Sequence, residues 1–151
     1  MNIASVLASK GVRVVTIGPD ASIRQALALL AEHNIGAVVV VDTVNRPVGI
    51  LSERDIVRAA AGDERLFDGR ISAIMTRQLI LGSPSDDLVS VGRTMTERRI
   101  RHLPIVDGGK LVGIVSIGDV VKAQRDRYQG EVDTLQLQLL EAEPPKGAPG
   151  H

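Results

Sequence analysis

The sequence predicts an α+β fold made of two copies of one small unit and a carboxy-terminal helix. A repeat carries this prediction, because residues 49–55 (GILSERD) return as residues 113–119 (GIVSIGD). Each copy follows an apolar stretch closed by aspartate, at residues 38–42 and 103–107. Self-similarity at a fixed offset marks the unit from which a fold is assembled. We therefore expect each copy to repeat the same order of strands and helices.

The first copy predicts alternating strands and helices. Residues 12–17 are mostly β-branched, which favours a strand. Ser22 can cap the helix that follows, and an Asn-Ile-Gly segment can end it. The four valines at 38–41 predict a strand that is buried on both faces. The predicted elements, in order, are strand 12–17, turn 18–20, helix 22–33, strand 38–41, strand 47–51 and helix 52–60.

The second copy repeats that order. Pro19 aligns with Pro84 at an offset of 65 residues, and Gly49 aligns with Gly113 at an offset of 64. The hairpin loop has therefore lost one residue between the copies, where such changes are best tolerated. The predicted elements are strand 79–81, turn 82–84, helix 86–99, a hairpin of strands 102–106 and 111–115, and a long helix from residue 116. Short helical segments are expected at 3–7 and 71–76.

Linker composition and periodicity divide the chain into four segments. The predicted segments are residues 1–62 (first copy), 63–123 (second copy), 124–142 (carboxy-terminal helix) and 143–151 (flexible tail). An apolar stripe recurs along the helix at Val132, Leu135, Leu139 and Leu140. The stripe can either fold back onto the core or form a contact in a dimer, and both alternatives stay open.

The composition excludes several classes of function. Lysine and arginine balance aspartate and glutamate at 18 each, and the only aromatic residues are Phe67 and Tyr128. Neither a basic surface nor stacking platforms for nucleic acid are therefore expected. The lack of cysteine excludes disulfides, thiolate metal ligands and a thiol nucleophile. Because no apolar run could span a bilayer and the first residues do not resemble a signal peptide, we predict a cytoplasmic protein.

Catalytic and metal-binding patterns are also missing from the sequence. The three histidines, His33, His102 and His151, are scattered and lack the spacing of metal ligands. No glycine-rich loop ends in the Gly-Lys-Ser/Thr segment that binds phosphate in nucleotide hydrolases. We therefore predict neither an enzyme nor a metal site.

The duplicated pattern resembles the cystathionine-β-synthase domain, or CBS domain, in its usual tandem arrangement. The resemblance spans roughly residues 3–123 and rests on the two Gly-x-x-Ser-x-x-Asp segments and on RHLPIVD at 101–107. It implies that each motif is a small three-stranded sheet with two helices, packed on its twin around a pseudo-two-fold axis. It also implies two clefts that bind AMP, ADP, ATP, NAD or S-adenosylmethionine, and a flat homodimer.

Four residues of the repeated segments are the central candidates for ligand contact. Asp55 and Asp119 lie in the first turn of a predicted helix. By the resemblance, each carboxylate accepts hydrogen bonds from a ribose diol; alternatively, it simply complements the helix dipole. Ser52 and Ser116 can contact phosphate or ribose by the same resemblance, or they can cap the helix.

Basic residues are candidates for phosphate contact. Arg101 and His102 precede the buried strand of the second copy, and by the resemblance they meet the phosphates of a nucleotide. Glycine and alanine stand at the matching positions 36–37, so the two clefts are expected to differ in phosphate affinity. Arg54 has a weaker claim, because its counterpart in the second copy is Gly118.

The remaining candidates come from strands. By the resemblance, the first strand of each copy holds the adenine, through Thr16 and Ile17 in one copy and Ile80 and Leu81 in the other. Ordinary core packing explains these apolar residues equally well. The predicted ligand-binding set is completed by Leu103 and Pro104 of the RHLPIVD segment.

Two hypotheses of function follow. The first is a stand-alone regulatory pair that binds an adenosine nucleotide or adenosyl ligand between its motifs and signals to an unidentified partner protein. The alternative is a structural or interaction module with vestigial clefts that acts through dimerisation. The missing basic pair of the first copy and the apolar carboxy-terminal stripe support the alternative. Neither hypothesis involves nucleic acid, a membrane or a required metal.

Overall fold

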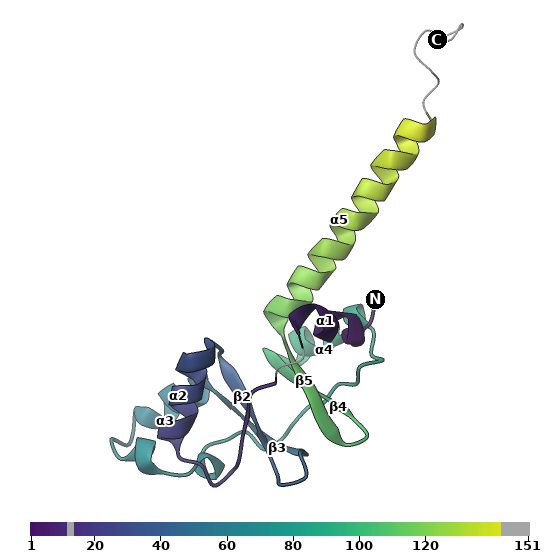
Figure 1. Cartoon of the computed structure of the whole chain (residues 1–151). Helices are drawn as coiled ribbons and strands as arrows, with labels where there is room; N and C mark the ends of the chain where they lie inside the picture. The colour runs from purple at the N-terminus through teal and green to yellow at the C-terminus, as the bar shows by residue number, and fades with distance from the viewer. Residues whose placement is uncertain (12–13, 143–151) are drawn as a thin grey trace, which may run out of the picture.

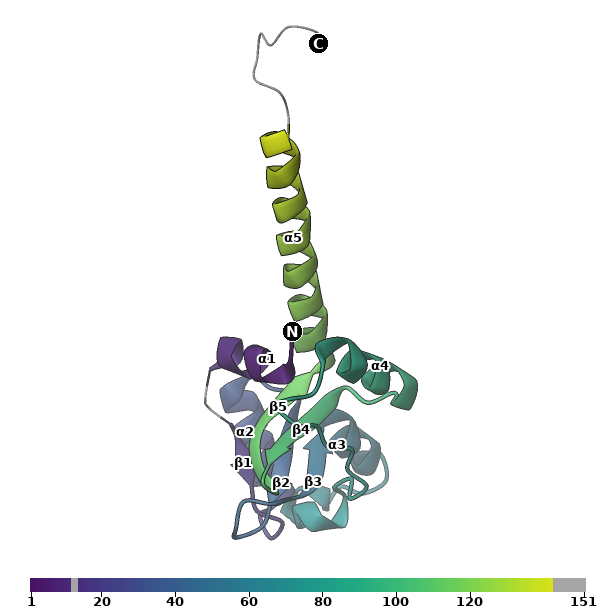
Figure 2. The same cartoon turned by 90° about the vertical axis from the view of Figure 1, so that its right-hand side faces the viewer.

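A computed structural model describes residues 1–11 and 14–142 (Figure 1). Two small sheets, each accompanied by helices, lie side by side, and a long helix leads away from them (Figures 1 and 2). The elements, in chain order, are α1 (Ile3–Lys10), β1 (Thr16–Ile17), α2 (Ile23–His33), β2 (Ala37–Val41), β3 (Pro47–Ser52), α3 (Glu53–Ala60), the 3-10 turns η1 (Leu66–Asp68) and η2 (Ile71–Ala73), α4 (Leu88–Arg98), β4 (His102–Asp107), β5 (Lys110–Ser116) and α5 (Ile117–Ala142). The predicted α+β fold is confirmed, while the predicted tail at 143–151 lies outside the described residues.

The first sheet has the order β1-β2-β3. β1 runs parallel to β2, and β2 runs antiparallel to β3. The valines of β2 are buried, as expected for a central strand that carries apolar side chains on both faces. β1 is shorter than the predicted strand at 12–17, because only Thr16 and Ile17 pair with β2. Residues 12–13 of that prediction lie outside the described residues.

The second sheet contains only β4 and β5, so the predicted strand at 79–81 is wrong. Its place is taken by a single parallel bridge from Gly82 to Ile105. A Cβ atom at Gly82 would lie 2.8 Å from Ile105 Cδ1 and 2.9 Å from Leu103 Cδ2, so only glycine allows this approach. The chain then turns at once, with the Asp86 carboxylate accepting a backbone N–H, and the ladder ends after one residue. The bridge also shows that Gly82, rather than Leu81, is the counterpart of Ile17.

The two hairpins share one register, which confirms the duplication. The matching Cα pairs are Ala37–Ser52 with His102–Ser116, and Val40–Gly49 with Ile105–Gly113. In each hairpin the register shifts immediately after the pair that contains glycine. The repeated sequence therefore specifies a repeated backbone, including its irregularity.

The glycine of each hairpin lies beneath an apolar side chain. A Cβ atom at Gly49 would lie 2.6 Å from the sulfur of Met75, and one at Gly113 would lie 2.5 Å from Leu7 Cδ2. Both positions therefore need glycine so that Met75 and Leu7 can pack directly on the strand. This packing occupies the space that a bound molecule would need to approach the two glycines.

The helix ends follow the sequence signals. Ser22 caps α2 and Ser52 caps α3, and in each cap the side chain at the third helical position accepts the backbone N–H of the serine in return. Asn34 ends α2 in the left-handed conformation, at φ 51°. α4 starts later than predicted, with Asp87 as its cap, because Asp86 is engaged in the preceding turn.

Each copy is completed by a segment from outside its own repeat. The backbone N–H of Ile3 donates to the Asp86 carbonyl at 2.9 Å, and α1 thereby joins the core of the second copy. The N–H of Ile71 donates to the Ala21 carbonyl at 2.9 Å, and Met75 joins the core of the first copy. The packing units are therefore interleaved along the sequence, and the boundary between the repeats at residues 62–63 stays a prediction.

The carboxy-terminal helix α5 contacts the rest of the molecule only at its start. Val120 is its only buried residue and packs into the core of the second copy. Beyond Gln124 the helix projects away from both sheets, as both views show (Figures 1 and 2). The apolar stripe therefore does not fold back onto the core in this structure.

Candidate ligand-binding site

A cavity of about 550 Å³ lies between the two copies. The end of β3 and the first turns of α3 line one side, and the connection from α4 to β4 lines the other. The cavity thus brings together five predicted site residues from both repeats: Ser52, Arg54, Asp55, Arg101 and His102. Because the connection comes from the opposite copy, Arg101 and His102 line the same cavity as the aspartate of the first copy.

Asp55 is half-buried at the base of this cavity. Its Oδ2 atom accepts the backbone N–H of Ser52 at 2.9 Å, and its own N–H donates to the Ser52 hydroxyl at 3.2 Å. The capping role predicted as an alternative for Ser52 is therefore seen in the structure, and Asp55 completes the cap. The bond uses one carboxylate oxygen, so the other remains able to accept a hydrogen bond from a ligand hydroxyl. In the described part of the chain, no lysine or arginine pairs with Asp55.

Positive charge predominates around Asp55. Arg54 and Arg58 come from α3, and two further arginines come from the opposite copy. Glu53 and Asp55 are the two acidic residues of the lining, so the arginines leave an excess of two positive charges. An arginine guanidinium is always charged and matches the geometry of phosphate oxygens. The cavity therefore suits an anionic group placed a short distance from Asp55.

Arg99 enters this lining through an unusual backbone conformation. It ends α4 in the left-handed region, at φ 55° and ψ 40°. Asn34 occupies the equivalent position at the end of α2, where asparagine is well tolerated. Arginine is a less favourable residue there, because a long side chain gains no local hydrogen bond that offsets the strain. This conformation places a guanidinium at the cavity.

His102 is half-buried, near the starts of the helices α3 and α5 that follow the two hairpins. Burial lowers its pKa, and the nearby Lys10 and Arg101 lower it further, while Asp119 and Glu53 oppose the shift. The imidazole is therefore neutral at pH 7 and can donate from one ring nitrogen. Binding of a phosphate beside it would favour the protonated form.

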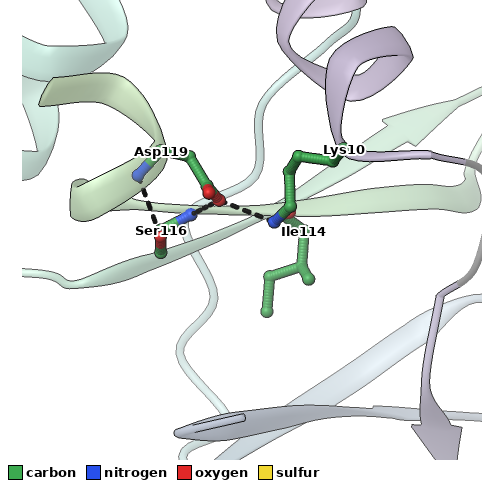
Figure 3. A network of polar contacts seen from close by, with 4 residues as sticks. All are labelled: Lys10, Ile114, Ser116 and Asp119. Carbon is green, nitrogen blue, oxygen red and sulfur yellow. Dashed lines mark hydrogen bonds and ion pairs between the residues drawn. The ribbon is translucent and has the colours of Figure 1, made fainter. Parts of the chain in front are cut away.

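Asp119 has the same cap as Asp55 but an additional partner (Figure 3). Its Oδ2 accepts the N–H of Ser116 at 2.8 Å, and its N–H donates to the Ser116 hydroxyl at 3.1 Å. The Lys10 ammonium donates to the same Oδ2 at 2.6 Å and to the Ile114 carbonyl at 2.7 Å. Lys10 lies at the end of α1, so this bond ties the amino-terminal helix to the second repeat.

The lysine changes the electrostatics of Asp119. Burial alone would raise the pKa of this carboxyl group, but the hydrogen bond and charge of Lys10 and the hydrogen bonds of Ser116 together hold the pKa below its ordinary value. The carboxylate is therefore ionised and already neutralised by a residue of the chain itself. Gly36 and Ala37 stand where the first cavity has Arg101 and His102, so this side of the molecule offers no matching basic pair.

The remaining predicted residues lie apart from the cavity at Asp55. Thr16 and Ile17 form β1, and Ile17 packs against the first core. Ile80, Leu81 and Leu103 line a separate hollow of about 430 Å³ beside the start of α4. Pro104 is buried in β4. Residues 1–11 and 14–142 contain no cluster of acidic and histidine side chains that could hold a metal ion, and no helix among them could cross a bilayer.

The model of the CBS domain family matches the chain twice, over residues 6–62 and 71–126. The chain belongs to the CBS domain family. The CBS domain-containing protein YhcV of Bacillus subtilis is 35% identical over 121 residues, which are 80% of this chain and 86% of that protein. The crystal structure of the CBS protein ATU1752 from Agrobacterium tumefaciens is 41% identical, covers 82% of this chain and 99% of its own, and superposes with a TM-score of 0.78.

Two other CBS structures contain adenosine compounds. The CBS pair of protein MJ0100 was solved with 5′-methylthioadenosine and S-adenosyl-L-methionine; it is 26% identical, covers 84% of this chain and 98% of its own, and has a TM-score of 0.74. The protein PAE2072 from Pyrobaculum aerophilum was solved with AMP; it is 32% identical, covers 79% of this chain and 89% of its own, and has a TM-score of 0.70. Relatives of this CBS pair therefore bind adenosine ligands.

Two arginines that line the cavity, and Lys10 beside Asp119, were not among the predicted ligand contacts. Arg99 follows the last residue of α4, and the left-handed helix end turns the chain back toward the cavity. Arg58 lies one helical turn after Arg54 and so shares its face of α3, a spacing that the sequence displays. No local sequence pattern points to a role for Lys10, because its partner Asp119 is more than a hundred residues away along the chain.

Proposed function

We propose that this CBS pair is a regulatory module, rather than an enzyme, that binds a phosphorylated adenosine ligand in the cavity at Asp55. One observation carries the proposal: the Asp55 carboxylate, which has no ion-pair partner among the described residues, lines the same cavity between the repeats as four arginines. A carboxylate that accepts hydrogen bonds from a ribose diol and guanidinium groups that bind phosphate would together select a nucleotide. The ligand-bound structures of PAE2072 and MJ0100 support the adenosine part of this proposal.

The charge of the cavity favours AMP, ADP, ATP or NAD over S-adenosylmethionine. The last compound carries a positively charged sulfonium group, which four arginines would repel. Nucleotides place their phosphates on the side of the ribose away from the base, where Arg99 and Arg101 could bind them. We therefore rank the phosphorylated compounds above the sulfonium compound as ligands of this chain.

We further propose one strong site per chain. At Asp119, the Lys10 ammonium competes with a ribose hydroxyl for the carboxylate, and the matching basic pair is missing. In this proposal only the second cleft is vestigial. The alternative hypothesis of an interaction module differs, because it treats both clefts as vestigial. The signal would pass, in the cytoplasm, from the occupied cavity to a homodimer contact or to a partner protein, since the cavity joins both repeats.

Calorimetric titration of the full chain with AMP, ADP, ATP, NAD and S-adenosylmethionine tests this function. Asp55→Asn keeps an acceptor for the helix cap but weakens the bond to a diol, and Arg101→Ala removes a charged donor. Each is expected to weaken nucleotide binding about 10- to 100-fold, as for the loss of a hydrogen bond to a charged group.

Asp119→Asn is the matched control, since it makes the same change at the equivalent cap of the other repeat. It is expected to change nucleotide affinity less than about threefold. A larger loss in this variant than in Asp55→Asn would move the site to the second cleft. Failure of all five compounds to bind a ligand-free preparation would favour the interaction module.

A further inference from the structure

The projecting part of α5, residues 125–142, exposes apolar side chains along its whole length. Tyr128, Leu135 and Leu139 are 69%, 59% and 67% exposed, and Val132 lies between them on the same face. We call these four residues the α5 seam. At 1.5 Å per residue the projecting part is about 27 Å long. After its first turn, where Asp126 still lines a hollow with residues of α1, the views show no other described element beside it (Figures 1 and 2).

The seam follows the spacing of a coiled coil. Its members are separated by four, three and four residues, which places them at alternating a and d positions of a heptad. Arg125 and Ala142 continue the same pattern at either end. A lone helix of this length is only marginally stable in water. Burial of the seam against another helix would supply the missing stabilisation.

We propose that the occupant of this face is the α5 helix of a second copy, packed antiparallel to the first. The pairing is self-complementary in size, because Tyr128 meets Leu139 of the second copy and Val132 meets Leu135. It also places the large Arg125 beside the small Ala142. Positions that flank the seam are mainly glutamine, namely Gln129, Gln136 and Gln138, so no like charges face one another across the contact.

Charge decides the direction of the second helix. In a parallel pair, Arg125 would face Arg125 of the other copy within the packed seam, where two unpaired guanidinium groups are unfavourable. In the antiparallel pair, each Arg125 lies at the last turn of the other helix. That turn exposes backbone carbonyls with negative partial charge, and Glu141 is the only charged residue near the end of the helix as described.

This contact is separate from the ligand cavity, which lies between the repeats and includes no residue of α5. It therefore does not rest on the proposed function. A dimer of this kind would hold two pairs of repeats at opposite ends of a short rod. Each cavity would then remain open to ligand.

Sedimentation equilibrium of the full chain tests the seam with a control on the same helix. Leu135→Lys/Leu139→Lys changes two seam residues, whereas Leu137→Lys/Leu140→Lys changes two leucines that are equally exposed, at 60% and 66%, but lie off the seam. The seam variant should weaken self-association at least 100-fold, and the control should change it less than about threefold. Equal effects of the two variants, a monomeric unsubstituted chain, or a flat dimer through the repeats that persists unchanged in the seam variant would overturn the proposal.

Cross-linking tests the direction without depending on the charged variants. The chain contains no cysteine, so introduced thiols are the only ones present. Under mild oxidation, Arg125→Cys/Ala142→Cys should form covalent dimers through contacts between the two different positions, while Ala142→Cys alone should not. Efficient dimer formation by Ala142→Cys alone would show a parallel pair and overturn the antiparallel arrangement. A thermal unfolding midpoint of each variant close to that of the unsubstituted chain would show that the repeats remain folded.

Discussion

The two repeats have the same hairpin register and the same serine–aspartate cap, but their aspartates have different surroundings. Asp55 faces arginines from the opposite repeat and has no basic partner in the described structure, whereas Asp119 is bound by Lys10. Most of the residues that differ come from outside the repeated segment, on α1 or at the connection from α4 to β4, whereas Arg54 and its counterpart Gly118 differ within it. Duplication therefore preserved the backbone of the site, and neighbouring segments gave each copy its own chemistry.

The packing over the hairpin glycine is expected to show the largest difference between the repeats. Gly113→Ala places a methyl group against the branched side chain of Leu7, and overpacking of this kind costs about 1–3 kcal/mol of unfolding free energy. Gly49→Ala meets the flexible thioether of Met75 and should cost less. Urea unfolding of both variants measures the difference. Equal losses would show that the shape of the overlying residue is unimportant.

The residues that end α2 and α4 are expected to show the next largest difference between the repeats. Arg99→Gly should stabilise the fold by about 1 kcal/mol, because glycine adopts the left-handed conformation without strain. The same change should weaken AMP binding severalfold through the loss of a cavity guanidinium. Asn34→Gly is the matched control in the first repeat and should alter both quantities little. Thermal melting and calorimetry give the two values, and unchanged AMP affinity in Arg99→Gly would remove that residue from the site.

The smallest effect concerns Lys10 and pH. Since the folded pKa of Asp119 is lowered, its contribution to stability is present above its unfolded pKa, near about 3.9, and is lost as the pH falls through the folded pKa. Lys10→Met should raise the pKa of Asp119 and reduce the unfolding free energy at pH 6 by less than about 1 kcal/mol, since the pair is partly exposed.

A carboxyl titration followed by NMR, together with urea unfolding at pH 6 and pH 3, measures both effects of Lys10→Met. Lys122→Met serves as the control, because this lysine lines a surface hollow together with Lys10 and Asp119 but does not bond to Asp119. An unchanged Asp119 titration in Lys10→Met would mean that the ion pair does not persist in solution.

Local sequence signals predicted the fold well where one residue type determines a backbone feature. Ser22, Ser52 and Asn34 mark helix ends, and the valines of β2 mark a central strand. The strand predicted at 79–81 failed because its apolar residues carry no information about the close approach at Gly82, which the partner strand imposes. Propensity describes a segment alone, while pairing depends on what lies next to it.

The candidate site was predictable in part for the same reason. The repeated segments revealed Ser52, Asp55 and their counterparts, because both copies display them at one offset. The sequence also showed that basic residues occur before only one buried strand. It could not show that Arg101 and Asp55 line one cavity, since that depends on how the repeats pack. The contact between Lys10 and Asp119 likewise exists only in three dimensions.

The interleaving of α1 and residues 66–76 with the two cores has a consequence for biosynthesis. The first core needs nothing beyond Met75, so it can form while the carboxy-terminal third of the chain is still being translated. The second core joins Ile3 to Val120, and α1 must therefore wait for most of the chain before it finds its place. Contacts that close such long loops form late and slowly. A protein that lost its first helix would keep a folded first repeat but leave an apolar face of the second open to aggregation.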